Sequence, residues 1–267
     1  MAAPVPTRHA GPSRRRASGW VPDQHGAWAM LTLPVVAGVW LGGPGWVHLA
    51  LGAFWLVGYL AFYAAGRWLR SRRRRRELPP VLAYGTATLP LGLLTLLLAP
   101  QLLRWVPIYL PLLAVSLWLT ARGAERSLAN DAVTVVAACL MTPVAVDAVG
   151  GDRWGPVWVA FGVLLAYFLG TVLYVKTMIR ERGRRGYVRA SVLYHLAGTA
   201  AATGLATTGW QSWWLVALWA LLAGRAALGP ALNRRRSRPL RPVVVGVGEI
   251  VASLLLTVVV LAGLPLD

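Results

Sequence analysis

Nine long apolar runs constrain this chain more than any other feature of its sequence. Each is roughly 20 residues long, the length at which an α-helix crosses the hydrocarbon core of a bilayer. Because only helices and closed barrels satisfy their backbone hydrogen bonds in lipid, the runs predict an all-α fold, a polytopic transmembrane helix bundle of about nine spans over residues 21–267. The runs lie near residues 27–43, 46–68, 79–99, 105–121, 131–149, 154–176, 190–208, 212–232 and 243–264.

The composition agrees with a membrane location. Of the 267 residues, 57% are hydrophobic and 13% are charged, whereas a soluble domain has about 25% charged residues. The charge is uneven, with 27 Lys and Arg against 9 Asp and Glu, which gives a net charge of +18. Taken alone, so basic a chain is typical of nucleic-acid binders. The positions of the charges favour another interpretation.

The basic residues gather in alternate connections. Apart from Arg104, Arg153 and Arg225, they occupy the N-terminal tail and the breaks after the second, fourth, sixth and eighth runs, which together hold 24 of the 27. Since Lys and Arg concentrate on the cytoplasmic side of membrane proteins, this pattern predicts the N-terminus inside and the C-terminus outside. We therefore expect the basic residues to contact anionic lipid headgroups at the cytoplasmic face, and we expect no nucleic-acid partner.

Two smaller features bound the possible functions. Residues 1–20 are rich in Pro, Ser and Arg without apolar periodicity, so they are predicted to form a disordered cytoplasmic tail. Cys139 is the single cysteine and lies in an apolar run, which predicts a buried structural thiol and excludes a disulfide framework within one chain. Phosphate-binding loops of the GxxxxGK type, HExxH zinc motifs and GxSxG nucleophile elbows do not occur.

Polar residues inside or beside the spans are costly in lipid and are therefore candidates for function. Most of them fall on the predicted cytoplasmic side, where we expect a polar, anion-binding cavity. On one helix face, Lys176 and Arg180 would form a donor pair for a phosphate or carboxylate if the sixth helix continues that far. The alternative is a solvated loop that contacts lipid headgroups. The candidate residues are Asp23, Gln24, His25, Glu125, Arg126, Asn130, Asp131, Tyr174, Lys176, Arg180, Glu181, Arg182, Tyr187, Tyr194 and His195.

Two charged residues lie deeper in the last two spans. Counting from the helix ends places Arg225 and Glu249 at one level, roughly 10 Å below the cytoplasmic face. They are predicted to form an intramembrane ion pair, which either locks two helices together, forms the floor of a polar pocket or acts as a gate in a transporter. Asp147 and Asp152 fall toward the outer side and are expected at the interface.

The polar strings also carry a family resemblance. The strings DQHGAW at 23–28, ERSLAND at 125–131 and YVKTMIRER at 174–182, with Tyr194 and His195, resemble the YwiC-like family of bacterial integral membrane proteins. The resemblance covers about residues 20–264 and implies a multi-pass protein of the bacterial cytoplasmic membrane.

The predicted topology is also similar to that of UbiA-type intramembrane prenyltransferases. Those enzymes hold Mg²⁺ between two acidic motifs, in the loops after spans two and six, where the metal neutralises a diphosphate. Here those loops offer only Glu77 and Glu181, and Thr134 replaces the second acid of an NDxxD-like motif that begins at Asn130. No metal site is predicted, and the cofactor stays open.

Three functions remain open at this point, and the sequence does not decide whether the protein is an enzyme. The first is a UbiA-like protein that binds or processes lipid in the polar cavity. The second is a secondary transporter of a small anion or metabolite, which would need an internal repeat and broken helices. The third is a membrane assembly protein without turnover.

The predicted orientation can be tested with reporter fusions at the C-terminus. Alkaline phosphatase fused there is expected to be active, because it folds outside the cytoplasm, and a fluorescent protein at the same position is expected to stay dark. An inactive phosphatase together with a fluorescent reporter at the C-terminus would show an even number of spans.

Overall fold

A computed structural model describes residues 20–22, 25–236 and 240–265 of the chain. Across this described part the protein is helical, and no strand occurs in it. Residues Asp23 and Gln24 and the predicted tail up to residue 19 lie outside the described residues. The helices, with η for 3-10 helices, are α1 (His25–Gly42), α2 (Val47–Arg70), η1 (Arg75–Glu77), α3 (Leu78–Leu98), η2 (Pro100–Trp105), α4 (Val106–Ala121), α5 (Leu128–Cys139), α6 (Met141–Ala148), α7 (Trp154–Met178), α8 (Arg185–Thr207), α9 (Trp213–Arg235) and α10 (Pro242–Gly263).

Each predicted apolar run coincides with a helix, which confirms the all-helical fold. The fifth run is divided into α5 and α6 at Leu140. Pro143 lies just beyond this division and has no N–H to continue the helical ladder. The Leu140 N–H still donates to Val136 at 3.0 Å, and the Val144 N–H donates to Leu140 at 3.1 Å. The two segments therefore form one bent span.

In the described part, seven segments are long and apolar enough to cross a membrane. The other two long helices depart from this standard for different reasons. The apolar part of α1, Ala27–Gly42, is short, and α8 begins with Arg185 and Arg189 and carries further polar residues along its length. A helical membrane protein is thus confirmed, whereas the number of spans and their orientation stay predictions.

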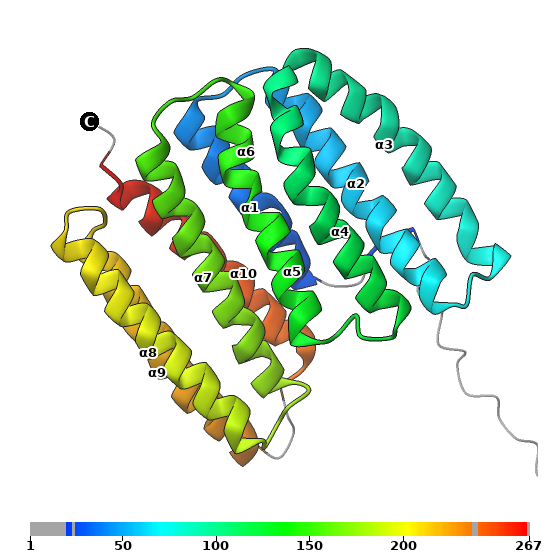
Figure 1. The fold of residues 1–267 in the computed structure, drawn as a ribbon. Helices are drawn as coiled ribbons and strands as arrows, with labels where there is room; N and C mark the ends of the chain where they lie inside the picture. Colours follow the sequence, from blue (N-terminus) through cyan, green and yellow to red (C-terminus); the bar gives the residue numbers. More distant parts are fainter. Residues whose placement is uncertain (1–19, 23–24, 237–239, 266–267) are drawn as a thin grey trace, which may run out of the picture.

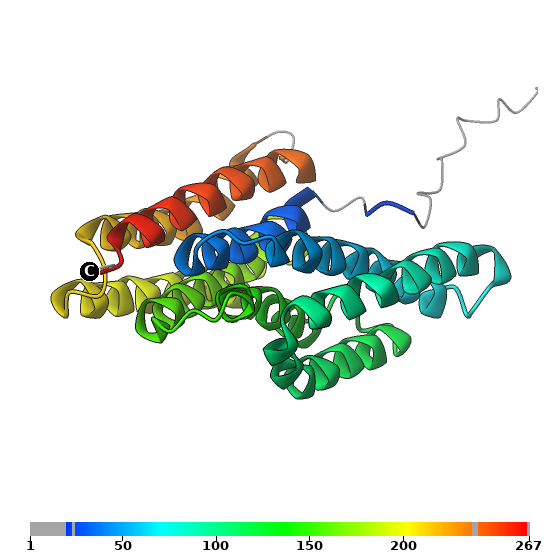
Figure 2. The same ribbon diagram turned by 90° about the horizontal axis from the view of Figure 1, so that it is seen from above.

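The helices form an elongated bundle (Figures 1 and 2). The helices α2, α3 and α4 lie on one flank, α8 and α9 lie on the other, and α1, α5, α6 and α7 lie between them. Successive spans run in opposite directions, so α1 begins at the lower end in Figure 1 and α10 finishes at the upper end. The last helix, α10, returns to pack against α1, α7 and α9. This return closes the bundle around α7.

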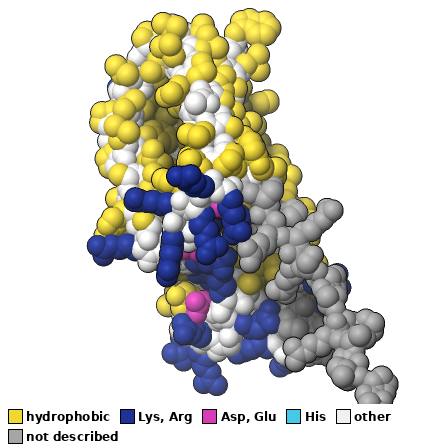
Figure 3. All heavy atoms as spheres, turned by 90° about the vertical axis from the view of Figure 1, so that its right-hand side faces the viewer, with side chains coloured by type: hydrophobic (Ala, Val, Ile, Leu, Met, Phe, Trp, Pro, Cys, Tyr) yellow, Lys and Arg dark blue, Asp and Glu magenta, His cyan; other side chains and the backbone are white. Residues whose placement is uncertain are grey.

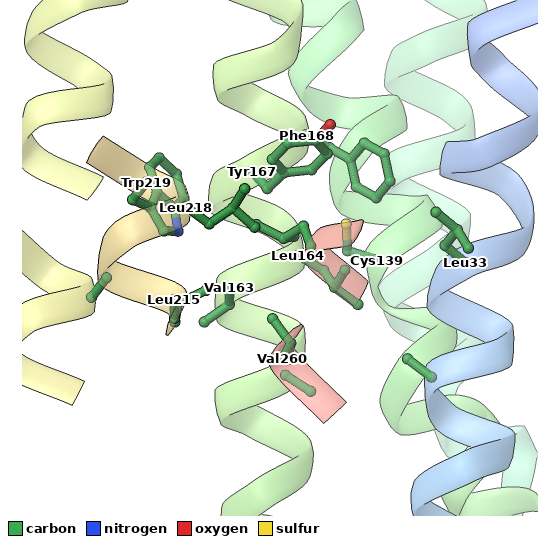
Figure 4. Close-up of a cluster of buried hydrophobic side chains, with 14 of the residues drawn as sticks. Leu33, Cys139, Val163, Leu164, Tyr167, Phe168, Leu215, Leu218, Trp219 and Val260 are labelled. Atoms are coloured by element: carbon green, nitrogen blue, oxygen red, sulfur yellow. The ribbon is translucent and has the colours of Figure 1, made fainter. Parts of the chain in front are cut away.

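The largest buried cluster surrounds α7 (Figure 4). Leu164 of α7 is fully buried, and Leu33, Cys139, Leu215 and Val260 approach it from α1, α5, α9 and α10. The Cys139 thiol is buried among them, as the sequence predicts. Apolar burial therefore fixes α7 as the central helix, and polar residues on its other faces contact α5, α9 and α10.

Two glycines allow the closest helix contacts. A Cβ at Gly38 would overlap the Thr142 carbonyl oxygen, and a Cβ at Gly198 would overlap the ring of Trp219. Small residues let helix backbones approach in membranes, where packing replaces the hydrophobic effect as the force between helices. These positions seat α1 on α6 and α8 on α9.

Charge and apolar surface are separated along the bundle (Figure 3). Lys and Arg side chains gather over one end, where α2, α4, α7 and α9 finish, and we call this the Arg-rich end. Farther along, large side chains such as Leu89, Leu97 and Trp214 are 72–75% exposed. An apolar surface this extensive is typical of contact with lipid.

Candidate functional site

The predicted site residues fall into two groups on different faces of α7. The first group lies between α5 and α7 at the Arg-rich end. The ammonium of Lys176 lies 2.8 Å from a carboxylate oxygen of Asp131 and donates to the Arg126 carbonyl at 2.7 Å. Lys176 is buried, with 8% of its surface exposed. Its charge is therefore already neutralised within the protein.

The ERSLAND string forms the turn that holds this group. Ser127 caps α5, because its hydroxyl accepts a hydrogen bond from the Asn130 N–H at 3.2 Å. The Asn130 side chain accepts from Ser116 at 2.7 Å and donates to the Glu125 carbonyl at 2.9 Å. The Glu125 carboxylate pairs with Arg70 of α2 at 3.3 Å. These contacts tie α2, α4, α5 and α7 together, so the string has a structural role at the Arg-rich end.

The predicted donor pair of Lys176 and Arg180 is not assembled. It required the helix to continue as far as Arg180, but α7 ends at Met178, Arg180 is exposed beyond the helix end, and Lys176 is paired with Asp131. Glu181 pairs with Arg184 at 2.8 Å, and Arg182 donates to the Met178 carbonyl at 3.0 Å. These residues form the exposed turn before α8.

The candidates Tyr187, Tyr194 and His195 all lie on α8. His195 is 1% exposed, and its Nδ1 donates to the Ser191 carbonyl at 2.7 Å, since a carbonyl oxygen can only accept. The Tyr194 hydroxyl donates to the Ala166 carbonyl of α7 at 2.9 Å. Tyr187 is half-buried and faces a separate hollow near Leu128. The Tyr194 hydroxyl thus joins α8 to α7, whereas the ion-pair and hydrogen-bond partners of Lys176 are on the α5 side.

The second group contains the ion pair that the sequence predicted between α9 and α10. The guanidinium of Arg225 contacts both carboxylate oxygens of Glu249, at 2.6 and 3.3 Å. Glu249 also accepts from Thr171 of α7 at 3.3 Å. The Arg225 guanidinium carbon lies 4.2 Å from the ring centre of Tyr174, a cation–π distance. Arg225 is thus held on two sides, by a carboxylate and by an aromatic ring.

One donor of this arrangement has no acceptor. The Nε–H of Arg225 is buried and finds no hydrogen-bond partner among the described residues. A buried donor without a partner costs free energy, roughly 1–3 kcal/mol and more for a charged group. Such an atom therefore points to a missing acceptor.

A pocket of about 330 Å³, with Arg225 in its lining, lies between α7, α9 and α10. Arg225, Glu249 and Tyr174 supply its polar lining, and most of the rest is aliphatic. Leu221 of α9 and Val244 of α10 are among the lining residues, and both are exposed on the side of the bundle. We call this space the lateral pocket. It joins an apolar surface to a charged pair of which Glu249 is buried and Arg225 is half-buried.

The structure buries Asp147 within the protein, which sequence reasoning did not predict. It was expected at the outer interface, but only 2% of its surface is exposed. Its carboxylate binds Arg104 and accepts from the Trp105 indole at 2.7 Å. Both partners lie in η2, at the end of the bundle opposite to the Arg-rich end. An isolated Arg and an isolated Asp on the same predicted side were the signal for this pair.

The remaining candidates are only partly described. The side chain of His25, at the start of α1, is outside the described set, as are Asp23 and Gln24. Within the described residues, no three His, Cys, Asp or Glu side chains come together as metal ligands would.

Comparisons with known proteins point to one family. Residues 21–146 match the profile of the YwiC-like protein family. The chain is 33% identical over 177 residues to a Bacillus subtilis protein called "Uncharacterized protein YwiC", covering 66% of this chain and 74% of that protein. It is 30% identical over 183 residues to an "Uncharacterized protein" of Haemophilus influenzae, again covering 66% and 74%. No solved structure matches, so the similarity to UbiA-type enzymes stays an expectation from topology.

The pairing of Lys176 predicts how substitutions at the Arg-rich end affect stability. Lys176→Met leaves Asp131 without its counter-charge, so we expect the free energy of unfolding to fall by about 2–3 kcal/mol. Replacing both residues, as Lys176→Met with Asp131→Leu, is expected to cost less than the single change, because no unpaired charge remains.

Thermal unfolding of the purified protein in detergent measures both effects. Arg180→Met is the matched control, since this exposed residue is expected to change stability by no more than about 0.5 kcal/mol. Equal melting temperatures for Lys176→Met and Arg180→Met would contradict the proposed pairing.

Proposed function

Because this chain belongs to the YwiC-like family and has the helices of a multi-pass membrane protein, we propose that it binds a membrane lipid in the lateral pocket. One observation carries the proposal: an apolar pocket on the side of the bundle has Arg225 in its lining, and the buried Nε–H of this residue lacks an acceptor within the described residues. A ligand that enters from the side would fill the apolar space and supply this acceptor.

The wall of the pocket favours a lipid over a water-soluble metabolite. Leu221, Val244, Val251 and Leu255 line it and are 48–65% exposed at its rim. In a bilayer, side chains exposed on the side of a helix bundle face lipid chains. The volume of about 330 Å³ falls at the small end of typical ligand sites, about 300–1,000 Å³. A pocket of this volume holds part of a lipid molecule, and the rest of the lipid's hydrocarbon chain lies outside, in the bilayer.

The Arg-rich end supports a second contact with lipid. Its exposed arginines, which include Arg180, Arg182 and Arg236, are suited to anionic headgroups. Each basic residue close to an anionic leaflet contributes about 1 kcal/mol to this attraction. In our proposal this end faces the cytoplasm of a bacterium, at the inner membrane, and anionic lipid holds it there.

These two contacts place the specific ligand away from the anionic headgroups. The sequence predicted one polar cavity open to the cytoplasm and lined by Lys176 and Arg180. Buried donors without a partner in the described part are found on Arg67, Ser191 and Arg225, and of these three residues Arg225 lines the lateral pocket. Our proposal therefore assigns the basic surface to the bilayer in general and the lateral pocket to a particular lipid.

The pocket can be blocked with one side chain. Leu221→Trp is expected to fill the lateral pocket, so the purified protein should retain several times less copurified lipid than the wild type, measured by mass spectrometry after detergent extraction. Leu228→Trp is the matched control, because Leu228 lies two turns along α9, is 62% exposed against 65% for Leu221, and does not line the pocket.

Melting temperatures of the two variants separate lipid loss from misfolding. We expect them to agree when both proteins are measured after delipidation. If the Leu221 variant unfolds at the same temperature as the control and still carries the wild-type amount of lipid, the proposed function is wrong.

A further inference from the structure

The lateral pocket has no net formal charge in its described lining. Arg225 and Glu249 are its two charged residues, and they contact each other at 2.6 and 3.3 Å. The remaining lining is Tyr174 and apolar residues or glycine. An anionic ligand would therefore meet a guanidinium that is already neutralised, and it would approach the Glu249 carboxylate as well.

The position of the pair along the helices also disfavours a charged headgroup. Arg225 lies ten residues before the end of α9, and Glu249 lies seven residues after the start of α10. At 1.5 Å per residue the pair is roughly 10–15 Å from the Arg-rich end. A phosphate bound at that depth would lose its contact with water and with the exposed arginines of the Arg-rich end. Ionised groups inside the membrane are rare unless a counter-charge accompanies them.

The group without a hydrogen-bond partner at this depth is a donor, the Nε–H of Arg225. An arginine side chain can only donate, and the terminal nitrogens of Arg225 both donate to Glu249. The buried Nε–H therefore needs an oxygen or nitrogen acceptor from the ligand. A carbonyl oxygen meets this need without adding charge.

We propose that the lateral pocket selects an uncharged lipid whose head carries a carbonyl oxygen, such as the ester of a diacylglycerol or the ring of an isoprenoid quinone. This inference rests on the proposed function and names the ligand class of the same pocket. The Nε–H of Arg225 donates to the carbonyl, and the lipid chain passes between Leu221 and Val244 to the bilayer. The Arg225–Glu249 pair holds the donor in place and excludes anions.

Two photoactivatable lipids with the same diazirine-bearing acyl chain test the selectivity. One is a diacylglycerol and the other is a phosphatidylglycerol, so they differ only in the head. The full-length protein in nanodiscs is irradiated with each lipid, and labelled peptides of α9 and α10 are quantified by mass spectrometry. We expect diacylglycerol to label these peptides about tenfold more than phosphatidylglycerol, which corresponds to about 1.4 kcal/mol.

Competition then separates the two sources of the carbonyl. Unlabelled diacylglycerol that displaces the probe better than an isoprenoid quinone identifies an ester ligand, and the opposite order identifies a quinone. Either order supports an uncharged carbonyl lipid. Displacement by phosphatidylglycerol at the same concentration as the better of the two would overturn the inference.

The Leu221→Trp and Leu228→Trp variants distinguish lipid binding in the lateral pocket from the preference for an uncharged head. If labelling is the same in the Leu221→Trp and Leu228→Trp proteins, no lipid occupies the lateral pocket, and the proposed function fails. If labelling depends on Leu221 but phosphatidylglycerol labels as strongly as diacylglycerol, lipid binding stands and the preference for an uncharged head is wrong. Glu249→Gln leaves Arg225 unneutralised, so it is expected to shift labelling toward phosphatidylglycerol, and an unchanged ratio would contradict the role given to the pair.

Discussion

The need to neutralise charge inside an apolar bundle governs much of this structure. A charged side chain in the middle of a membrane helix costs at least about 2.5–3.5 kcal/mol by insertion scales, unless a partner or water compensates it. Three ion pairs meet this need, and each joins segments that are separate helices in the fold. They are Arg104 with Asp147, Lys176 with Asp131, and Arg225 with Glu249. Each pair thereby restricts how its two helices rotate and slide against each other.

This neutralisation separates two kinds of basic residue. The exposed arginines at the Arg-rich end remain available to anionic lipid, and they account for most of the net charge of +18. Lys176, which is buried, and Arg225, which is half-buried, are bound to carboxylates. A chain with a very high net charge can thus contain a pocket without net charge. The proposed preference for an uncharged lipid follows from this division.

Much of the fold could be predicted from the sequence because helix length and hydrophobicity are local properties. The nine runs marked the helices, and counting along two of them brought Arg225 and Glu249 to one level. The partner of Lys176 could not be predicted in this way, because it depends on the end of α7 at Met178 and on the rotation of α5 against α7. The lateral pocket depends on how α9 and α10 pack against each other, and this packing could not be predicted from local sequence patterns. The burial of Asp147 depends on the short helix η2, which none of the apolar runs predicted.

An experimental structure of the protein in nanodiscs made from bacterial lipid would test the central claim most directly. The account predicts an elongated density between α9 and α10 that enters beside Leu221 and ends within hydrogen-bond distance of Arg225 Nε. A structure in which α9 and α10 close over Arg225, with a protein side chain as the acceptor of its Nε–H and no lipid between the helices, would contradict the account.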